Sequence, residues 1–510
     1  MSDRMVGHNG PMTDHGAGQR AATERPSGIA TVVVAVLAIG SVAAAAIRAM
    51  PNMGSPDRGV FVSTAERMVA GDRLYVDVWD NKDPVFYYLM AAGRLVSPLM
   101  DYVLEVGWLA VVAVATYALA RRASGATLPA VLAAATGLVA VTGAAYIAGY
   151  TYLPGTALVL VVAALTADRR DVWVGVAFGV LLFTKPMMAP LALVALAPWW
   201  WRTRSVRSVG RMAAGLAPVA VAFVVLLAAR GELGGWVAAQ LDNVGYSQQR
   251  LRDNGQNPVI DHLSRVIGAH EIVMLALLTV VGVAILWWSR RRTDAASRDA
   301  ATLAVAMLAT AVMSVLVIAA TGLGPWHNQL IQPAAVQAAA LLAVPAAWLL
   351  QRPVTAVACL LLAPIAGWAL GGAATVSDYR DSARFYRGSI GVLLQVPADA
   401  QSILALGPTG TYARLGGEYD DGHAHGLGGW RLACPRFHQY FFQPASTLEP
   451  VLACVATAPV VLVSPTFAPR PADMQTPDWN AFVQQGEELL AADYDCVAHE
   501  GFRLCTRKTG

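Results

Sequence analysis

Four charged side chains, those of Asp77, Asp80, Lys82 and Asp83, fall within seven residues of the sequence. Tyr75 precedes them, and three consecutive aromatic residues follow. A lysine offers a compact positive charge suited to a phosphate, and aspartates could hold a divalent cation or hydrogen-bond sugar hydroxyls. Ion pairing among the four is the alternative for at least one of them. The pattern indicates a site for an anionic, lipid-borne sugar, with Tyr75, Asp77, Asp80 and Lys82 as its binding residues.

Asp57 is the candidate catalytic residue. It is the first acid after the first hydrophobic stretch and directly follows Pro56. A carboxylate there could take the proton of an acceptor hydroxyl as it attacks an anomeric carbon. Asp57 could also cap the amphipathic helix predicted after it, and the two roles are compatible.

Lys185 is the sharpest single residue within the apolar part of the chain, in the run GVLLFTKPMMAPLALV. A lysine at mid-bilayer costs roughly 2.5–3.5 kcal/mol, so an intramembrane lysine is a functional hypothesis by default. Snorkelling to the membrane surface would reduce that cost. Phosphate binding is slightly favoured over snorkelling alone.

His327 follows Trp326 at the start of another apolar stretch. The pair could be an interfacial anchor, because tryptophan is enriched at that depth. His327 could also contact a phosphate or a sugar, so it joins the candidate binding residues.

The elements that position these residues follow from composition. Of the 510 residues, 56% are hydrophobic and 14% are charged, whereas soluble proteins carry roughly 25% charged residues. The net charge of +3 is too small to indicate a nucleic-acid partner. The predicted fold is a polytopic α-helical membrane protein, since a bilayer-crossing helix takes roughly 20 apolar residues.

About eleven transmembrane helices are expected. The pair between 172 and 200 is the least certain and is interpreted as two passes joined at Lys185-Pro186. The predicted spans cover 29–49, 102–120, 126–145, 152–167, 172–185, 187–200, 209–229, 271–288, 299–321, 333–350 and 354–374.

Arginine clusters between the spans predict the orientation, because positive residues stay on the cytoplasmic side. The clusters fit an even number of crossings between successive groups and an odd total. The N-terminus is therefore expected on the cytoplasmic side of a bacterial plasma membrane and the C-terminal domain on the extracytoplasmic side. The clusters are Arg20 and Arg25, Arg121 and Arg122, Arg169 and Arg170, the run from Arg202 to Arg211, Arg290 to Arg292, and Arg352.

Three regions follow. Residues 1–28 are predicted to be a disordered cytoplasmic tail, residues 29–375 a membrane domain with a first outer loop at 51–101, and residues 376–510 an extracytoplasmic α/β domain. Within the last, strands are expected at 402–406 and 460–463, a helix at 478–492, and a hairpin of 494–498 with 502–506. The turn at 407–410 hints at a phosphate loop after a strand, but a plain turn is favoured because a Walker lysine is missing.

Four of the five cysteines lie in this last region, whereas Cys359 lies inside an apolar span. Disulfides persist in oxidising compartments, so an even number of cysteines supports an extracytoplasmic domain. Cys434–Cys454 and Cys496–Cys505 is the favoured pairing, because the last two flank the predicted hairpin. A zinc site is the alternative, although the sequence lacks a CxxC spacing there.

Together these motifs resemble the GT-C glycosyltransferases, in particular the branch with protein O-mannosyltransferases and the lipid A aminoarabinose transferase. The resemblance covers roughly 29–375 and consists of short motifs. They are the first outer aspartate, Asp57; the run of Gly71, Tyr75, Asp77, Asp80, Lys82 and Pro84; the turn Thr184-Lys185-Pro186; and the element of His327, Gln329 and Pro333.

The resemblance implies an inverting glycosyltransferase that takes a sugar from a polyprenyl-phosphate donor at the outer membrane face. It implies Asp57 as the base, with Lys82, Lys185 and His327 on the lipid phosphate. Arg58 follows Asp57 where many relatives have glutamate, and an acid that many relatives carry in the second outer loop is replaced by tyrosines. A metal requirement is therefore doubtful: no cofactor is certain, and a divalent metal is left open.

The expected partners are the lipid-linked donor, the bilayer and an acceptor that is a glycan, a lipid or a protein. A non-enzymatic envelope-assembly membrane protein and a lipid-linked sugar transporter are the alternatives. A transporter would show acids inside the spans or symmetry between two halves, and the sequence has neither pattern.

Overall fold

The computed structural model describes residues 56–97, 99–143, 151–252, 267–321, 329–350, 398–416, 429–437, 445–470, 477–499 and 501–508, with a few single residues and a short stretch up to 46 besides. The predicted spans at 29–49 and 354–374 lie largely outside these described residues, as does the predicted tail at 1–28.

Helices make up most of the first 350 residues. They are α2 (Pro56–Val69), α3 (Pro84–Val96), α4 (Met100–Ser124), α5 (Thr127–Val141), α6 (Tyr152–Ala167), α7 (Asp171–Leu182), η2 (Pro186–Met188), α8 (Ala189–Thr203), α9 (Val206–Ala229), α10 (Leu233–Arg252), α12 (Ala269–Ser289), α13 (Ala295–Thr321), α14 (Gln332–Leu341) and α15 (Ala343–Leu349).

The polytopic helical fold expected from the sequence is confirmed. Five of the described helices are long and apolar enough to cross a membrane, and three shorter apolar helices, α5, α6 and α7, accompany them. The predicted spans between 102 and 350 coincide with helices α4 to α9 and α12 to α15. The short pair around Lys185-Pro186 forms two helices, α7 and α8, joined by the single turn η2.

Small residues let two of these helices touch. A Cβ atom on Gly175 of α7 would lie 1.9 Å from the carbonyl oxygen of Met212 in α9, and one on Gly215 of α9 would lie 1.9 Å from that of Val172. Only glycine allows this approach of two backbones, which is the usual device for close packing of membrane helices. The α7–α9 contact is therefore fixed by backbone shape.

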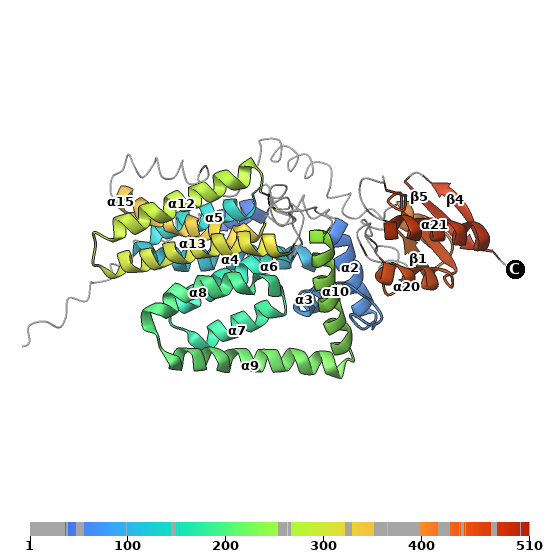
Figure 1. The fold of residues 1–510 in the computed structure, drawn as a ribbon, viewed down its shortest axis with the longest axis horizontal. Coiled ribbons are helices and arrows are strands. Elements are labelled where there is room, and N and C mark those ends of the chain that lie inside the picture. The colour runs from blue at the N-terminus through green and yellow to red at the C-terminus, as the bar shows by residue number, and fades with distance from the viewer. Residues whose placement is uncertain are drawn as a thin grey trace, which may run out of the picture.

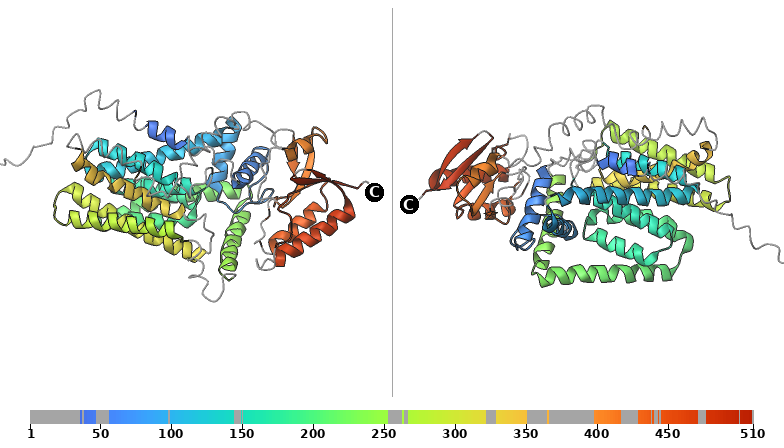
Figure 2. Two further views of the ribbon diagram at one scale, coloured as in Figure 1. Left: turned by 90° about the horizontal axis from the view of Figure 1, so that it is seen from above. Right: turned by 180° about the vertical axis from the view of Figure 1, so that it is seen from behind.

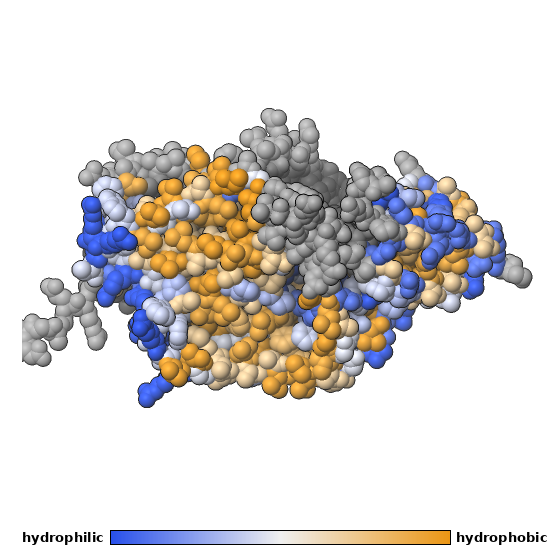
Figure 3. Space-filling view, viewed as in Figure 1, coloured by the Kyte–Doolittle hydropathy of each residue, from blue (hydrophilic) through white to orange (hydrophobic). Residues whose placement is uncertain are grey.

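The membrane helices run roughly along one axis, which is horizontal in Figure 1, whereas α2, α3 and α10 lie across one end of the bundle. The C-terminal domain lies beyond that end in all three ribbon views (Figures 1 and 2). Apolar side chains cover the visible face of the bundle, and hydrophilic residues gather at the end away from the C-terminal domain (Figure 3). The chain is a multi-pass membrane protein with a polar head at one end.

The C-terminal domain has a five-stranded mixed sheet in the order β2-β1-β3-β5-β4. β1 is parallel to β2 and β3, and β5 is antiparallel to β3 and β4. Helices α20 and α21 pack against each other, and α21 leads into β4. The elements are α18 (Ala398–Leu404), β1 (Gly410–Leu415), β2 (Trp430–Leu432), α20 (Ala445–Val455), β3 (Val460–Val463), α21 (Pro477–Asp493), β4 (Tyr494–His499) and β5 (Phe502–Arg507).

One predicted element of this domain is wrong. The expected strand at 402–406 falls on helix α18 and the turn after it. Ala400 and Ile403 are the buried residues of α18, and their spacing of three suits a helix, whereas a strand would alternate. The turn at 407–410 precedes β1, and the Trp430 ring would lie 2.6 Å from a Cβ atom on Gly410. That ring covers the turn, which is not a phosphate loop.

Two disulfides join the four cysteines of this domain in the expected pairs, Cys434–Cys454 and Cys496–Cys505. Cys496 and Cys505 are direct partners in the register of β4 and β5. The other disulfide ties the segment after β2 to α20. That segment is the part of the domain that contacts the first loop of the membrane domain.

Candidate active site

Arg67, near the end of α2, organises the loop that carries the charged cluster. Its side chain is 6% exposed, and its Nε lies 2.6 Å from Asp72 Oδ2. Its other two nitrogens donate to the backbone oxygens of Asp77 at 2.5 Å and Cys434 at 2.9 Å. One buried guanidinium therefore holds both the loop and the C-terminal domain.

Asp77 takes part in an ion pair on the surface of this loop. Arg73 donates from Nε to Asp77 Oδ2 at 2.8 Å and from Nη2 to Asp77 Oδ1 at 3.0 Å. The hydrogen bond from the Arg73 side chain lowers the pKa of Asp77 below its usual value. Asp77 thus pairs with an arginine outside the cluster, whereas the alternative of ion pairing within the cluster describes Asp80 and Lys82.

Tyr75 is buried at the centre of the loop. Its φ of 66° is unusual for a residue with a side chain, and its hydroxyl donates to the Lys82 carbonyl at 2.6 Å. A Cβ atom on Gly235 of α10 would lie 2.8 Å from the Tyr75 carbonyl oxygen, so glycine is required there. Burial raises the pKa of Tyr75 well above its ordinary value, which keeps the hydroxyl protonated and available as a donor to Lys82.

Asp80 and Lys82 lie together behind Tyr87. Asp80 is 1% exposed and accepts hydrogen bonds from the Tyr87 hydroxyl and, at 2.6 Å, from the Asn81 backbone. Lys82 Nζ lies 3.8 Å from Asp80 Oδ1 and 5.5 Å from the centre of the Phe61 ring. Asp80, held by the Tyr87 hydroxyl, therefore fixes the position of the Lys82 ammonium group.

Asp83, the last residue before α3, is the site residue that the sequence-based selection left out. It is 6% exposed, and Gln240 of α10 donates to its Oδ1 at 3.1 Å. Burial raises the pKa of Asp83 from 3.8 to about 7, against the opposing influence of Lys185 and Lys82. Strongly perturbed groups with a specific charged partner often mark functional sites.

Lys185 approaches the same place from the turn between α7 and α8. The Val85 backbone N–H donates to the Phe183 carbonyl at 3.0 Å, which joins the two segments. Lys185 is 7% exposed, and its Nζ lies 4.1 Å from the centre of the Tyr152 ring. The chain has three lysines in all, and two of them, Lys82 and Lys185, oppose the rise in the pKa of Asp83.

Helix α10 closes this site from the side. Asn243 donates to the Asn81 carbonyl at 2.8 Å, and the fully buried Glu232 just before α10 accepts from the Leu74 backbone at 3.0 Å. The contacts of α10 with the loop indicate that this helix covers the site. Long-range partners such as Gln240 leave no signal in local sequence patterns.

Asp57 is the second residue of α2, but the position of its side chain lies outside the described structure. His327 also lies outside the described residues. The structure therefore brings together Tyr75, Asp80, Lys82 and Lys185 from the predicted set, while the roles of Asp57 and His327 stay predictions.

Metal binding was left open by the sequence. Among the described residues, no group of three or more histidine, cysteine, aspartate or glutamate side chains is placed to hold a metal ion. The carboxylates of the described site already have hydrogen-bond partners, and its two lysines suit an anion. No step is assigned to a metal.

Comparisons with known proteins show which family and which solved structures this chain is similar to. Residues 83–319 match the model of glycosyltransferase family 87. This stretch begins at Asp83 and includes Lys185 and Gln240. A search of the curated proteins finds no match in sequence.

Solved structures with related architecture were also compared. The structure of ArnT from Cupriavidus metallidurans bound to undecaprenyl phosphate has a TM-score of 0.54 at 15% identity, covering 94% of this chain and 98% of that one. The arabinofuranosyltransferase AftD from Mycobacteria has a TM-score of 0.49 at 13% identity, covering 94% and 40%. The archaeal oligosaccharyltransferase AglB from Archaeoglobus fulgidus has a TM-score of 0.47 at 12% identity, covering 95% and 75%.

The architecture is similar to that of ArnT, and residues 83–319 match glycosyltransferase family 87. Both likenesses favour a glycosyltransferase over the non-enzymatic alternatives.

Proposed function

We propose that the chain is an inverting glycosyltransferase that moves a sugar from a polyprenyl-phosphate donor to a cell-envelope acceptor on the outer face of a bacterial plasma membrane. One observation carries this proposal. The backbone hydrogen bond from Val85 to Phe183 joins the segments of Lys82 and Lys185, and both lysines oppose the rise in the pKa of the buried Asp83 at the end of the bundle near the C-terminal domain.

Two buried ammonium groups suit a phosphate, whose charge they would balance on binding. In this site the donor phosphate is the leaving group, and negative charge grows on it as the bond to the sugar breaks. Preorganised cations at that position lower the barrier, because their stabilisation increases as the charge develops. The undecaprenyl phosphate of the ArnT structure supports the same ligand class here.

Asp83 would offset part of the positive charge of the two lysines before the donor arrives. Its pKa of about 7 places the carboxyl near half-protonation at neutral pH. An incoming phosphate adds negative charge beside it and favours the protonated form. Both lysines would then balance the charge of the phosphate, and the neutral carboxyl could donate a hydrogen bond from its own oxygen.

The remaining step needs one base. Asp57, in the first turn of α2, would take the proton of the acceptor hydroxyl as that oxygen attacks the anomeric carbon. The bond between the anomeric carbon and the phosphate oxygen breaks as the new bond forms, so the configuration inverts. His327 would contact the phosphate or sugar from the segment before α14.

The apolar part of the donor would lie towards the membrane. A mostly apolar pocket beside Thr184 is lined by Phe86 and Met90 of α3, Trp108 of α4 and Pro154 of α6, with Asp101 and Glu105 of α4 also in its lining. Because Thr184 immediately precedes Lys185, this pocket borders the proposed phosphate site. It supports a polyprenyl chain that leaves the site between α3, α4 and α6.

The orientation in this proposal rests on charge. The turns after α4, α6, α8 and α12 carry the arginine clusters and lie at the end of the bundle away from the C-terminal domain (Figure 1). Positive residues favour the cytoplasmic side, and the two disulfides favour an oxidising compartment for the other end. Both arguments support an extracytoplasmic site.

Binding and turnover separate the proposed roles. We expect Lys82→Ala and Lys185→Ala each to weaken undecaprenyl-phosphate binding at least tenfold, because the charge pair exists in the ground state. We expect Asp57→Asn to retain binding and to lose roughly 10²–10⁴-fold in turnover. Native mass spectrometry of the purified protein measures binding, and a panel of polyprenyl-phosphate pentoses and hexoses measures turnover.

Lys508→Ala is the matched control, since this third lysine caps carbonyls of α21 at the surface of the C-terminal domain. Lipid binding by the Lys82 and Lys185 variants equal to that of the control would contradict the phosphate site. Normal turnover by Asp57→Asn would move the base elsewhere, with Asp80 as the next candidate.

A further inference from the structure

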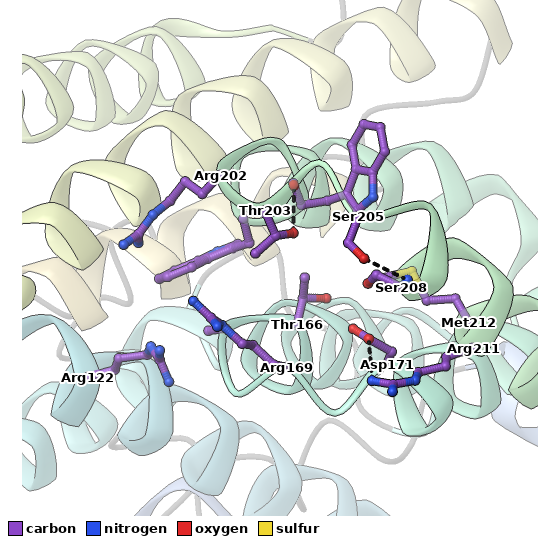
Figure 4. Close-up of a pocket in the computed structure, with 13 residues that line it drawn as sticks. Arg122, Thr166, Arg169, Asp171, Arg202, Thr203, Ser205, Ser208, Arg211 and Met212 are labelled. Carbon is purple, nitrogen blue, oxygen red and sulfur yellow. Dashed lines mark hydrogen bonds and ion pairs between the residues drawn. The ribbon is translucent and has the colours of Figure 1, made fainter.

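A second polar cavity lies at the opposite end of the helical bundle from the lysine site. It has a volume of about 220 Å³ and lies between the α6–α7 turn, the α8–α9 connection and the last turns of α4. Figure 4 shows Arg122, Arg169 and Arg202 on one side of it and Arg211 with Asp171 on the other. Nothing in the proposed transfer reaction uses these residues.

The cavity is lined by more positive than negative side chains. Four arginines and one aspartate line it. Arg122 and Arg202 share the carboxylate of Asp299, at 2.9 and 2.5 Å, and Arg122 also pairs with Asp168 at 2.9 Å. Arg211 lies 3.9 Å from Asp171, a loose pair.

Arg169 carries the surplus charge most clearly. It lies in the turn between α6 and α7, and it makes no ion pair with any residue that the structure describes. Its side chain turns towards Arg122 in the close-up (Figure 4). Like charges gathered without an equal number of acids repel one another, and a bound anion would relieve this repulsion.

Two indole N–H groups give independent evidence for a ligand that accepts hydrogen bonds. Trp199 is 6% exposed, and its ring lies 5.9 Å from both the Arg122 and the Arg202 guanidinium carbons. The Nε1 atoms of Trp199 and Trp200 are buried and have no partner among the described residues, and both side chains line the cavity. A buried donor without an acceptor is costly, and an indole can only donate.

Exposed apolar residues lie close in sequence to the residues that line the cavity. Trp173 of α7, Trp201 of α8, and Val206 and Val209 of α9 are 60%, 61%, 84% and 47% exposed. In a membrane protein such side chains face the acyl chains and headgroups of lipids. A ligand with an anionic head and an apolar tail could therefore reach the cavity from the bilayer.

We propose that this cavity is a binding site for a phosphate group, carried by an anionic phospholipid or by a soluble phosphate ester. The arginines supply charge-assisted, bidentate hydrogen bonds to phosphate oxygens. The indole N–H groups of Trp199 and Trp200 supply two more donors. The site is separate from the lysine site, so occupancy changes the stability of this end of the bundle.

The test uses the full chain in nanodiscs and reads its thermal unfolding and its bound lipids. One arm replaces part of the phosphatidylcholine by phosphatidylglycerol, and another adds inorganic phosphate at constant ionic strength to phosphatidylcholine discs. A rise in Tm in the first arm identifies the lipid headgroup as the source, and a rise in the second identifies a soluble phosphate.

Arg169→Gln is the diagnostic variant, because Arg169 is exposed and has no ion pair to lose within the described structure. We expect its affinity for the effective phosphate compound to fall at least tenfold, about 1.4 kcal/mol. Trp200→Phe removes one donor N–H while keeping the ring, and we expect a smaller fall in the same direction. Native mass spectrometry measures retained phosphatidylglycerol in parallel.

Arg291→Gln is the control, since Arg291 does not line the cavity and stacks on Trp287, 4.1 Å from the centre of that ring. It should bind as the unmodified protein does. The proposal is overturned if neither probe raises Tm, or if Arg169→Gln responds to both probes as Arg291→Gln does. The second result would show a general attraction of anions to the arginine-rich face.

Discussion

At the scale of single residues, the contrast between lysine and arginine is informative. Of 37 basic residues, three are lysines, and Lys82 and Lys185 are both placed at the proposed phosphate site. Elsewhere in the chain, arginines lie in surface turns and form ion pairs. An ammonium group is compact and titrates more readily than a guanidinium when buried. Lys185 also packs against Gly155, where a Cβ atom would lie 3.3 Å from Lys185 Cβ, so the turn has little room.

Asp83 gives the site a pH dependence. Its pKa is raised from 3.8 to about 7 mainly by burial, so the folded protein binds more protons than the unfolded chain between these values. Stability therefore falls as pH rises through this window. We expect Asp83→Asn to remove that part of the fall in Tm between about pH 4 and pH 7. Differential scanning fluorimetry of the purified protein measures it.

Asp77→Asn is the matched control at the residue scale. The hydrogen bond from Arg73 lowers the pKa of Asp77, so its contribution has the opposite sign and is lost as pH falls. A difference between unmodified protein and Asp83→Asn that does not vary with pH would contradict the buried, protonatable carboxyl.

At the scale of elements, the sequence predicts the membrane part well and the site only in part. Helix α6 has the predicted limits, because its apolar run ends in a polar turn. The charged cluster was visible as a motif, yet the importance of Asp83 depends on Gln240 and Lys185, which lie far along the chain. The misassigned strand at 402–406 has a physical cause too: a seven-residue helix offers too few turns for its period to be distinguished from alternation.

Contacts across elements join the C-terminal domain to the loop of the candidate site. The Trp79 backbone donates to the Pro435 carbonyl at 2.8 Å. The Arg436 guanidinium lies 4.0 Å from the centre of the Trp79 ring and 3.3 Å from Asp242 of α10. The disulfide at Cys434 fixes this segment, so three elements distant in sequence meet at the loop.

We expect Arg436→Ala to lower kcat/KM roughly 3- to 30-fold, because a partly buried cation–π contact and ion pair together contribute about 1–2 kcal/mol. The effect should appear in kcat more than in undecaprenyl-phosphate binding, since the residue positions the loop and is not on the phosphate. Arg436→Lys should restore part of the activity. Steady-state kinetics with the donor panel provides the measurement.

Arg503→Ala serves as the comparison for this prediction, because Arg503 pairs with Glu487 within the same domain and away from the loop. Equal losses in the two variants would indicate general destabilisation of the domain and would remove the positioning role of Arg436.

At the scale of the whole molecule, orientation is the property to measure. We expect a cysteine at Gln485, exposed on α21, to react with a membrane-impermeant maleimide in intact cells. A cysteine at Thr293, exposed in the turn between α12 and α13, should react only after permeabilisation. Both variants are made in a Cys359→Ala background, and the disulfide cysteines do not react. The reverse pattern would place the active site inside.

The length of α7 has a further consequence. Its 12 residues span roughly 18 Å at the rise of an α-helix, whereas the hydrocarbon core of a bilayer is roughly 30 Å thick. A helix that starts at the arginine-rich face therefore delivers Lys185 on the order of 10 Å short of the opposite interface. Either the carrier phosphate sinks to that depth, or the bilayer thins around the α7–α8 hairpin. Membrane thickness would then affect the proposed transfer reaction, because the lipid phosphates of a thin bilayer lie closer to the two lysines than those of a thick one.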